Sequence, residues 1–266
     1  MTAQSASGNF VNELFGLSGQ TAVVIGGTGV LGGAICDGLA AAGAHVIVAR
    51  RSAERGIHRV AEIENAGGEA SFMSVDATSR DSLKQLQEHA FASHETVDIL
   101  VNCAGVNSAT PYEEIDDADW SRVIEGNLTA THLASQVFAS AIAEQTAGGC
   151  VLNIGSVTAH LPLSKVFAYS ASKAAVVNLT KNLAREYAPR KVRFNVLCPG
   201  FFPAEQNRKI LTPERTNAIL SRTPMGRFGD PEELIGAVLL LVSRRAGSFN
   251  TGAEIYVDGG FTGMRF

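Results

Sequence analysis

Long apolar runs, a basic leader and an excess of positive charge are all missing from this sequence of 266 residues. No apolar run approaches the roughly 20 residues that a helix needs to span a bilayer. Residues 1–10 are mostly polar and uncharged, so they lack the basic and apolar regions of a secretory signal. The net charge of −4 provides no general attraction to nucleic acid or anionic membranes. We therefore expect neither of these partners, and we expect a cytoplasmic location.

Cysteine is scarce, and histidine shows no pattern. The four cysteines form no C-x-x-C pair, and three of them lie in apolar segments, so we expect buried free thiols in a reducing compartment. The six histidines have no metal-ligand spacing, and we expect no metal site.

Apolar residues make up 45% of the chain, enough for the core of one large α/β domain or of two smaller ones. Strand-like and helix-like segments alternate without a linker or an internal repeat. This pattern predicts one doubly wound domain, a parallel sheet of about seven strands with helices on both faces. The expected strands are residues 21–25, 45–49, 70–75, 97–101, 149–154, 192–197 and 254–257. We place a leader that docks on the body at residues 1–18 and the domain at 19–266.

A long helical region is expected at about residues 117–144, with Asn127 in its middle. Asparagine is a poor helix former. Its presence inside a helix indicates either a role for its amide or a local kink.

A glycine-rich turn joins the first strand to an alanine-rich helix. Gly27, Gly29 and Gly32 fit the pattern G-x-G-x-x-G, and strand–turn–helix is the context in which this pattern binds dinucleotides. Glycine permits the tight turn and lets the backbone approach a pyrophosphate, which then sits at the positive N-terminus of the helix. A glycine-rich turn without a ligand is the alternative.

Arg50 and Arg51 follow the second strand, where many dinucleotide-binding folds carry a carboxylate for the adenosine ribose. A guanidinium matches the oxygens of a phosphate and does not repel a 2′-phosphate. The sequence therefore favours NADP(H) over NAD(H), which stays an alternative, as do two solvated arginines at a helix start.

Tyr169 and Lys173 are four residues apart on an expected helix, so their side chains share one face. A free phenol has a pKa of about 10, and a nearby ammonium group lowers it. This spacing predicts a tyrosine that acts as a general acid/base. Ser156, after the fifth strand, is placed to bond the same substrate oxygen. The alternative is a surface tyrosine beside a solvated lysine.

In a doubly wound sheet, ligands bind beyond the carboxyl ends of the strands. The glycine turn, Asp76, the turn from Asn102 to Gly105, Ser156 and Pro199-Gly200 all follow expected strands. We expect Asp76 to bond the adenine amine and Tyr169 to donate a proton as hydride reaches the substrate.

The ordered set of motifs resembles the classical short-chain dehydrogenase/reductase family and covers almost the whole chain. The matches are the glycine turn, Asp76, Asn102-Cys103-Ala104-Gly105, Asn127, Ser156, Tyr169-x-x-x-Lys173, Pro199-Gly200 and Val257-Asp258-Gly259-Gly260. The resemblance implies a catalytic tetrad of Asn127, Ser156, Tyr169 and Lys173, in which Asn127 helps to hold a water for a proton relay. It also implies the strand order 3-2-1-4-5-6-7 and a homotetramer.

The sequence departs from the family pattern in two places, the glycine turn and the segment after Pro199-Gly200. Ile25 and Val30 replace a threonine and a glycine of the usual turn, and Ala204 replaces a threonine that contacts the carboxamide, so that a backbone amide near Phe202 has to serve. The cofactor-binding residues implied in total are Gly26, Thr28, Gly29, Val30, Leu31, Gly32, Arg50, Arg51, Asp76, Ala77, Asn102, Ala104, Gly105, Tyr169, Lys173, Pro199, Gly200 and Phe202.

Residues 201–229 form an irregular insert that the family uses as a substrate lid. Its polar and cationic content, with Lys165 before Tyr169, favours a hydroxylated anionic substrate. Three stretches, G-F-F-P-A-E-Q-N-R at 200–208, P-L-S-K at 162–165 and T-P-M-G-R-F-G at 223–229, also resemble a sugar-acid subgroup that includes D-mannonate oxidoreductases (fructuronate reductases). The candidate substrate residues are Asn107, Ser156, Val157, His160, Lys165, Phe167, Gln206, Asn207 and Arg208.

Three readings of the function stay open. The first is an NADPH-linked oxidoreductase of a sugar acid or polyol. In the second, Val157, His160 and Phe167 line a pocket for an apolar ketone of the steroid or 3-oxoacyl type, and Arg208 is a solvated lid residue or a tetramer contact. The third is a dinucleotide sensor without catalysis, against which the intact tetrad argues.

Overall fold

The structure is a computed structural model that describes residues 10–202 and 212–263. Its centre is a seven-stranded sheet in which every neighbouring pair of strands is parallel, in the order β3-β2-β1-β4-β5-β6-β7. The strands are β1 (Thr21–Ile25), β2 (His45–Ala49), β3 (Glu69–Met73), β4 (Ile99–Asn102), β5 (Gly149–Ile154), β6 (Val192–Pro199) and β7 (Glu254–Val257). The predicted fold class and strand order are confirmed.

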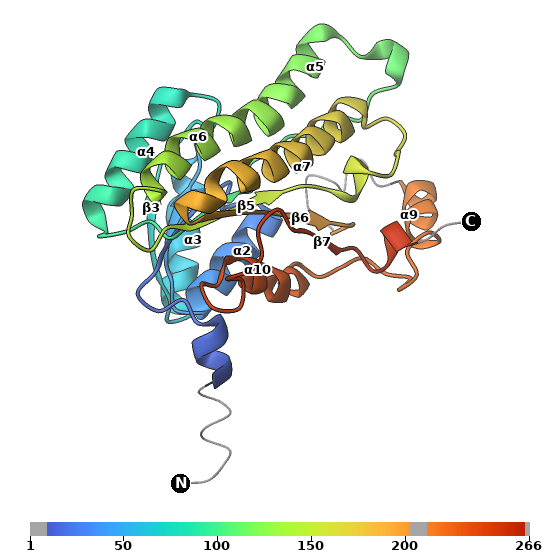
Figure 1. Cartoon of the computed structure of the whole chain (residues 1–266). Helices are drawn as coiled ribbons and strands as arrows, with labels where there is room; N and C mark the ends of the chain where they lie inside the picture. Colours follow the sequence, from blue (N-terminus) through green and yellow to red (C-terminus); the bar gives the residue numbers. More distant parts are fainter. Residues whose placement is uncertain (1–9, 203–211, 264–266) are drawn as a thin grey trace, which may run out of the picture.

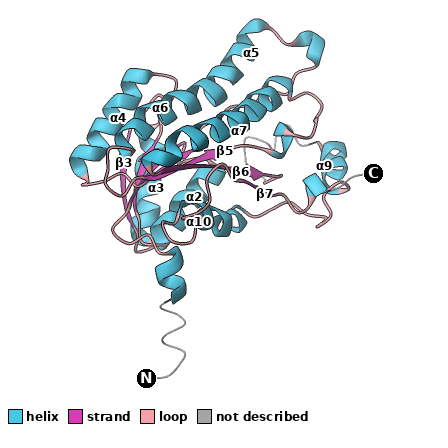
Figure 2. Cartoon of the chain, in the orientation of Figure 1, coloured by secondary structure: helices cyan, strands magenta, loops and turns pink. Residues whose placement is uncertain are grey.

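Helices cover both faces of the sheet (Figures 1 and 2). One layer contains α2 (Val30–Ala41), α3 (Ala53–Asn65) and α10 (Ile235–Val242); the other contains α4 (Arg80–Ser93), α6 (Ala130–Ile142) and α7 (Phe167–Tyr187). The shorter elements are α5 (Asp117–Ile124), α9 (Pro213–Leu220) and the 3₁₀ turns η1 (Tyr112–Glu114), η3 (Val157–Ala159), η4 (Ala188–Arg190), η5 (Pro231–Leu234) and η6 (Phe261–Gly263).

The central strands form because they are apolar along their whole length. All five residues of β1 and all four of β4 are buried, as expected for parallel strands with helices on both faces. Alternate side chains enter two cores: Val24 packs in the α2 layer and Val23 in the α4–α6 layer.

Three strands differ from the expected bounds. The third, expected at residues 70–75, is Glu69–Met73, and the fourth and sixth differ for local reasons. The fourth strand starts at Ile99 rather than Val97, because both backbone groups of Val97 bond the side-chain amide of Gln145 at 2.9 and 3.0 Å. The sixth strand continues to Pro199, which pairs with Val257 at the end of the ladder, where the missing N–H of proline is tolerated.

The helical region around Asn127 contains a wide turn. A π-helical turn, Glu125–Thr129, connects α5 to α6, and the three segments form one long rod (Figure 1). The amide of Asn127 bonds both backbone groups of Val106, at 2.7 and 3.0 Å, and the hydroxyl of Ser172 at 2.9 Å. Of the two expected reasons for an asparagine here, the structure shows the use of its amide, in the kind of turn that often marks functional sites.

The described part of the N-terminal segment packs against the body. Residues 10–15 are helical, Leu17 is fully buried, and its N–H donates to the carbonyl of Ala42 at 2.8 Å. Within residues 10–202 and 212–263, no helix has the length and apolar character needed to cross a membrane.

The strand order reverses at β1, which lies between β2 and β4. The connections after β1 and β4 leave the sheet towards opposite faces, which opens a crevice at its carboxyl edge. This crevice is where the predicted site residues meet.

Candidate active site

One cavity of about 590 Å³ runs along the carboxyl edge of the sheet. It brings together most of the residues predicted to bind a cofactor. Its wall contains Gly26, Gly29, Val30, Leu31, Gly32, Arg50, Arg51, Asp76, Ala77, Ala104, Gly105, Tyr169, Lys173, Pro199, Gly200 and Phe202. Of the predicted set, only Thr28 and Asn102 do not line it.

The turn after β1 forms a glycine-lined hollow, called the glycine cradle below, in which added side chains would clash with the backbone. Gly26 has φ 91°, and a Cβ added there would stand 2.6 Å from the backbone nitrogen of Ala104. A Cβ at Gly32 would stand 2.3 Å from the carbonyl oxygen of Gly26. Gly29 precedes α2 without a capping side chain, so the first N–H groups of the helix stay available for an anion. The replacements at Ile25 and Val30 leave this turn intact, because Ile25 ends β1 in the core and Val30 faces the cavity.

Arg50 and Arg51 follow β2, and Arg55 in the first turn of α3 adds a third guanidinium whose charge acts on Arg50. Nη1 of Arg50 donates to the hydroxyl of Thr28 at 2.7 Å, so Thr28 positions the arginine from outside the cavity. Burial lowers the pKa of Arg50, and the charges of Arg55 and Arg51 lower it further. Among the described residues, no carboxylate forms an ion pair with any of the three. This unbalanced positive charge fits the 2′-phosphate of NADP.

Asp76 lines the same end of the cavity as an ionised carboxylate. Its pKa is lowered by hydrogen bonds from the hydroxyl and the N–H of Thr78, at 2.7 and 3.0 Å, and by the charge of Arg51.

Asn102 does not face the cavity. Its side chain is buried and donates to Oδ1 of Asn153 at 2.8 Å and to the hydroxyl of Ser135 at 3.2 Å, in the helix layer behind the sheet. Successive residues of a strand point to opposite faces, so the neighbouring Cys103 lies in the cavity wall instead. The side chain of Asn102 therefore supports the sheet from behind, and a contact of Asn102 with the cofactor stays a prediction.

Ser156, Tyr169 and Lys173 meet in the cavity wall from β5 and α7. The hydroxyl oxygen of Ser156 accepts hydrogen bonds from the N–H and the hydroxyl of Thr158, at 3.2 and 3.1 Å. Because both acceptor positions are used, the proton of Ser156 is free to point at a substrate oxygen or at Tyr169.

Burial shifts the pKa values of both Tyr169 and Lys173. Burial raises the pKa of Tyr169, and a hydrogen bond with Ser156 opposes that rise. Burial also lowers the pKa of Lys173 to about 8. The lysine donates to the carbonyl of Ile154 at 2.7 Å, and its nitrogen is 5.6 Å from the centre of the phenol ring. The pKa of Tyr169 is therefore raised by burial, in the direction opposite to the expected lowering by Lys173, and the phenol is held in its protonated form.

Asn127 lies beneath the cavity and is fully buried. A Cβ added at Gly105 would stand 3.1 Å from Oδ1 of Asn127 and 3.8 Å from Nζ of Lys173. Asn127 and Lys173 therefore flank one point of the cavity floor, and the amide of Asn127 holds the loop between them through Val106.

The candidate substrate residues divide into three groups. Asn107 and Val157 line the cavity with Ser156, whereas Gln206, Asn207 and Arg208, like Ala204, lie outside the described residues. His160, Lys165 and Phe167 are described but stand apart from the cavity wall.

The structure shows why each of these three residues does not line the cavity. His160 pairs with Glu254, with 2.5 Å between Nε2 and Oε1, and Phe167 packs its ring edge against Tyr112 at 5.1 Å between centroids. Lys165 has φ 67° and precedes the first residue of α7, so the helical spacing that would align it with Tyr169 does not apply.

The cavity also has a wall that sequence analysis did not identify. Its members come from the loop before α7, from α5, from α9 and from the segment after α9: Arg122, Thr158, Leu163, Val166, Arg215, Ile219 and Phe228. A signal for α9 was present in the sequence. Thr212 before Pro213 is a strong helix start, and Arg215 and Ile219 are one turn apart.

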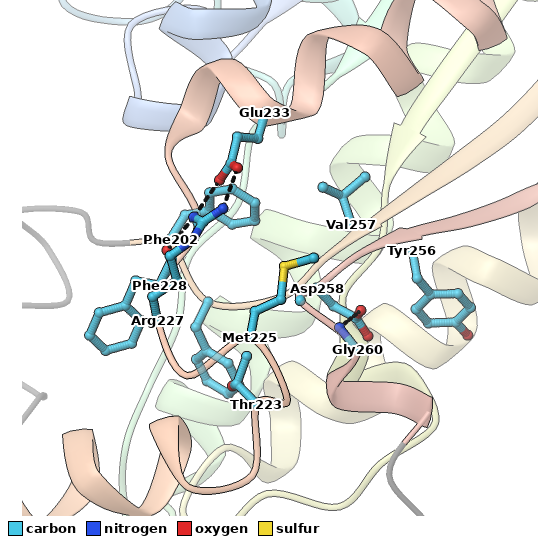
Figure 3. A pocket seen from close by; sticks show the side chains of 13 residues that line it. Phe202, Thr223, Met225, Arg227, Phe228, Glu233, Tyr256, Val257, Asp258 and Gly260 are labelled. Carbon is cyan, nitrogen blue, oxygen red and sulfur yellow. Dashed lines mark hydrogen bonds and ion pairs between the residues drawn. The ribbon is translucent and has the colours of Figure 1, made fainter.

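A second cavity of about 390 Å³ adjoins the first and shares Phe201, Phe202 and Phe228 with it (Figure 3). Arg227 forms a two-pronged ion pair with Glu233, at 2.8 and 2.6 Å, and donates to the carbonyl of Phe228 at 2.9 Å (Figure 3). The ion pair thus fixes the wall between the cavities.

In the ranges that the structure covers, no three His, Cys, Asp or Glu residues gather as metal ligands.

Comparison with known proteins gives a consistent set of relatives. A family model described as "Enoyl-(Acyl carrier protein) reductase" matches residues 28–262. The chain is 37% identical to an uncharacterised oxidoreductase, UxuB, of Bacillus subtilis, over 92% of this chain and 95% of the other. It is 34% identical to the 5-keto-D-gluconate 5-reductase of Escherichia coli, over 94% and 98%. Among solved structures, a gluconate 5-dehydrogenase from Burkholderia cenocepacia, in complex with NADP and tartrate, superposes with a TM-score of 0.91 at 29% identity, covering 96% and 100% of the two chains.

Proposed function

Because the chain belongs to the classical short-chain dehydrogenase/reductase family, and is therefore an NAD(P)-dependent oxidoreductase, we propose that it interconverts a ketone and a secondary alcohol on a sugar acid, with NADP as the preferred cofactor.

One observation carries the proposal. A single cavity joins the glycine cradle and the unbalanced charges of Arg50 and Arg51 to Ser156, Tyr169 and Lys173. The first end has the donors for a pyrophosphate and a 2′-phosphate, and the second has the acid and the hydroxyl that a carbonyl oxygen needs.

NADP, when bound, supplies or accepts the hydride. In the proposed reduction, Ser156 donates a hydrogen bond to the substrate carbonyl, which holds it beside Tyr169. Tyr169 then gives its proton to the oxygen as negative charge develops there, and takes it back when the alcohol is oxidised. The ammonium of Lys173 stabilises the phenolate that is left, and Asn127 keeps the floor of the site in place.

The substrate class rests on the relatives. The Escherichia coli enzyme is named for a keto sugar acid, and the Burkholderia protein holds tartrate, a hydroxylated dicarboxylate. We favour a sugar acid over an apolar ketone on this basis. A steroid or 3-oxoacyl ketone remains the second outcome of the test, because Leu163, Val166 and Ile219 give the wall an apolar part.

The test is a spectrophotometric screen at 340 nm with NADPH and NADH against keto sugar acids, neutral keto sugars and apolar ketones. We expect NADPH oxidation with a keto sugar acid such as 5-keto-D-gluconate. Turnover of apolar ketones alone would remove the sugar-acid assignment and keep the reaction class.

We further propose a homotetramer in the cytoplasm, with residues 1–18 as a docked leader and residues 201–229 as the substrate lid. The family resemblance supports the tetramer and the lid, and the described cysteines, all free, suit a reducing compartment. Light scattering coupled to size-exclusion chromatography tests the tetramer; a monomer at micromolar concentration would contradict it.

A further inference from the structure

The lid helix α9 presents one side of itself to the catalytic cavity. Arg215 and Ile219 are four residues apart and both line the cavity wall, so they mark the face that α9 turns inward. Ile219 is only 6% exposed, and Arg215 is partly buried. A guanidinium on this face needs a partner.

The other cationic residues that line the cavity already have a hydrogen-bond or ion-pair partner, or have an assigned role. Arg50 and Arg51 stand at the 2′-phosphate end, and Lys173 bonds the carbonyl of Ile154. Arg122 is held by its own helix, since Nη2 and Nε donate to Oδ1 of Asp119 at 2.6 and 3.2 Å.

Arg215 has no such neighbour within residues 10–202 and 212–263, where no carboxylate pairs with it. Glu214 precedes it, but hydrogen bonds with the backbone and with the hydroxyl of Thr212 lower the pKa of Glu214 and hold its carboxylate at the start of α9.

The rest of this part of the wall is apolar. Val166, Phe202 and Ile219 are buried there, and Leu163 and Phe228 complete the lining. A partly buried guanidinium with which no described carboxylate pairs is able to form charge-assisted hydrogen bonds with an anion that enters the cavity.

We propose that Arg215 binds the carboxylate of the substrate and so sets the preference for a sugar acid over the matching neutral sugar. This inference rests on the proposed function and deepens it. It replaces Lys165, which lies outside the cavity, as the cation that recognises the acid.

The experiment compares two ketones that differ at one group. 5-Keto-D-gluconate carries a carboxylate where L-sorbose carries a hydroxymethyl group, so only the acid engages a carboxylate-binding arginine. Rates of NADPH oxidation are measured for the wild type, for Arg215→Met, and for Arg222→Met. Arg222 is a matched control, because it lies just beyond α9, is exposed and lines neither cavity.

We expect Arg215→Met to lower kcat/KM for the acid about 10- to 150-fold, the factor for losing a hydrogen bond to a charged group, mainly through KM. The value for L-sorbose should change less than about threefold, and Arg222→Met should leave both unchanged. The affinity for NADPH, measured by fluorescence titration, should stay the same and show that the variant is folded. If Arg215→Met loses NADPH binding, Arg215→Gln, which removes the charge and keeps a shorter polar side chain, takes its place in the comparison.

Two results overturn the inference in distinguishable ways. If the wild type reduces L-sorbose as well as the acid, or reduces neither, the sugar-acid function fails and the inference fails with it. If the wild type prefers the acid and Arg215→Met keeps that preference, the proposed function stands and Arg215 is not the carboxylate-binding residue.

Discussion

Replacing Arg50 by glutamine tests the strongest electrostatic feature of the site. The change removes the guanidinium of Arg50 and breaks its hydrogen bond to Thr28. It leaves the glycine cradle and the catalytic residues untouched. The variant should therefore lose affinity for a cofactor with a 2′-phosphate and keep its affinity for one without.

The size of the loss follows from the surroundings of Arg50. A hydrogen bond to a charged group contributes about 1.5–3 kcal/mol. Arg50 is partly exposed, so solvent screening reduces this contribution, and Arg51 remains to hold the phosphate. We expect a loss of about 1–2 kcal/mol, which is roughly a 5- to 30-fold drop in kcat/KM for NADPH.

The assay measures initial rates at 340 nm against each cofactor, with a saturating ketone and at two salt concentrations. The value for NADH should change less than about threefold. The wild-type preference for NADPH should shrink at 1 M salt, where the screening length is about 3 Å. Arg55→Gln is the control: Arg55 belongs to the same charge cluster but does not line the cavity, so its effect should be smaller. Equal losses for NADPH and NADH would refute the assignment, because they would show a structural role for Arg50.

Three further perturbations test the catalytic and structural arguments. Tyr169→Phe should lower kcat by roughly 10²- to 10⁴-fold with a much smaller effect on NADPH affinity, because it removes the hydroxyl that carries the transferable proton; turnover near the wild-type level would exclude Tyr169 as the acid. Lys173→Met should raise the free energy of unfolding at pH 7. Burial lowers the pKa of this lysine from 10.5 to about 8, so its charge opposes folding fully below pH 8 and ceases to do so as the pH rises towards 10.5. Urea unfolding should show a gain of order 1–3 kcal/mol at pH 7 that shrinks by pH 10, and a loss at both pH values would contradict it. Gly26→Ala should lower the free energy of unfolding by about 2 kcal/mol and weaken NADPH binding, because of φ 91° and the approach to Ala104. Gly236→Ala in α10, with no atom near its added Cβ, should instead be neutral or slightly stabilising, and similar losses for both would disprove the crowding argument.

Local signals in the sequence predicted the parallel sheet, the glycine turn and the spacing of Tyr169 and Lys173, whereas the strand order came from the family resemblance. Buried strands, a glycine turn before a helix, and tyrosine and lysine one turn apart each have a short-range pattern. The expected site residues that do not line the cavity include some whose direction depends on tertiary packing. The side chain of Asn102 can be placed only when the face of β4 on which it lies is known. Lys165 can be placed only when the first residue of α7 is known.

The far wall of the cavity could not be predicted because it is assembled from distant segments. Arg215 was inside the expected lid, but nothing local shows which face of α9 turns towards the cavity. The pKa of Tyr169 depends in the same way on burial, which the spacing of Tyr169 and Lys173 does not reveal.

The position of Asn127 depends on the number of residues in the π-helical turn Glu125–Thr129. A π turn contains one residue more than an α turn, so it behaves as a one-residue insertion and turns α6 by about 100° relative to a continuous α-helix from α5. Deleting a single residue here would restore a regular helix and improve its local hydrogen bonds. The same deletion would rotate the amide of Asn127 away from Val106 and Ser172, and the loop beside Lys173 would lose its anchor. In this part of the chain, therefore, an evolutionary change in length would be selected against more strongly than most changes in side-chain identity.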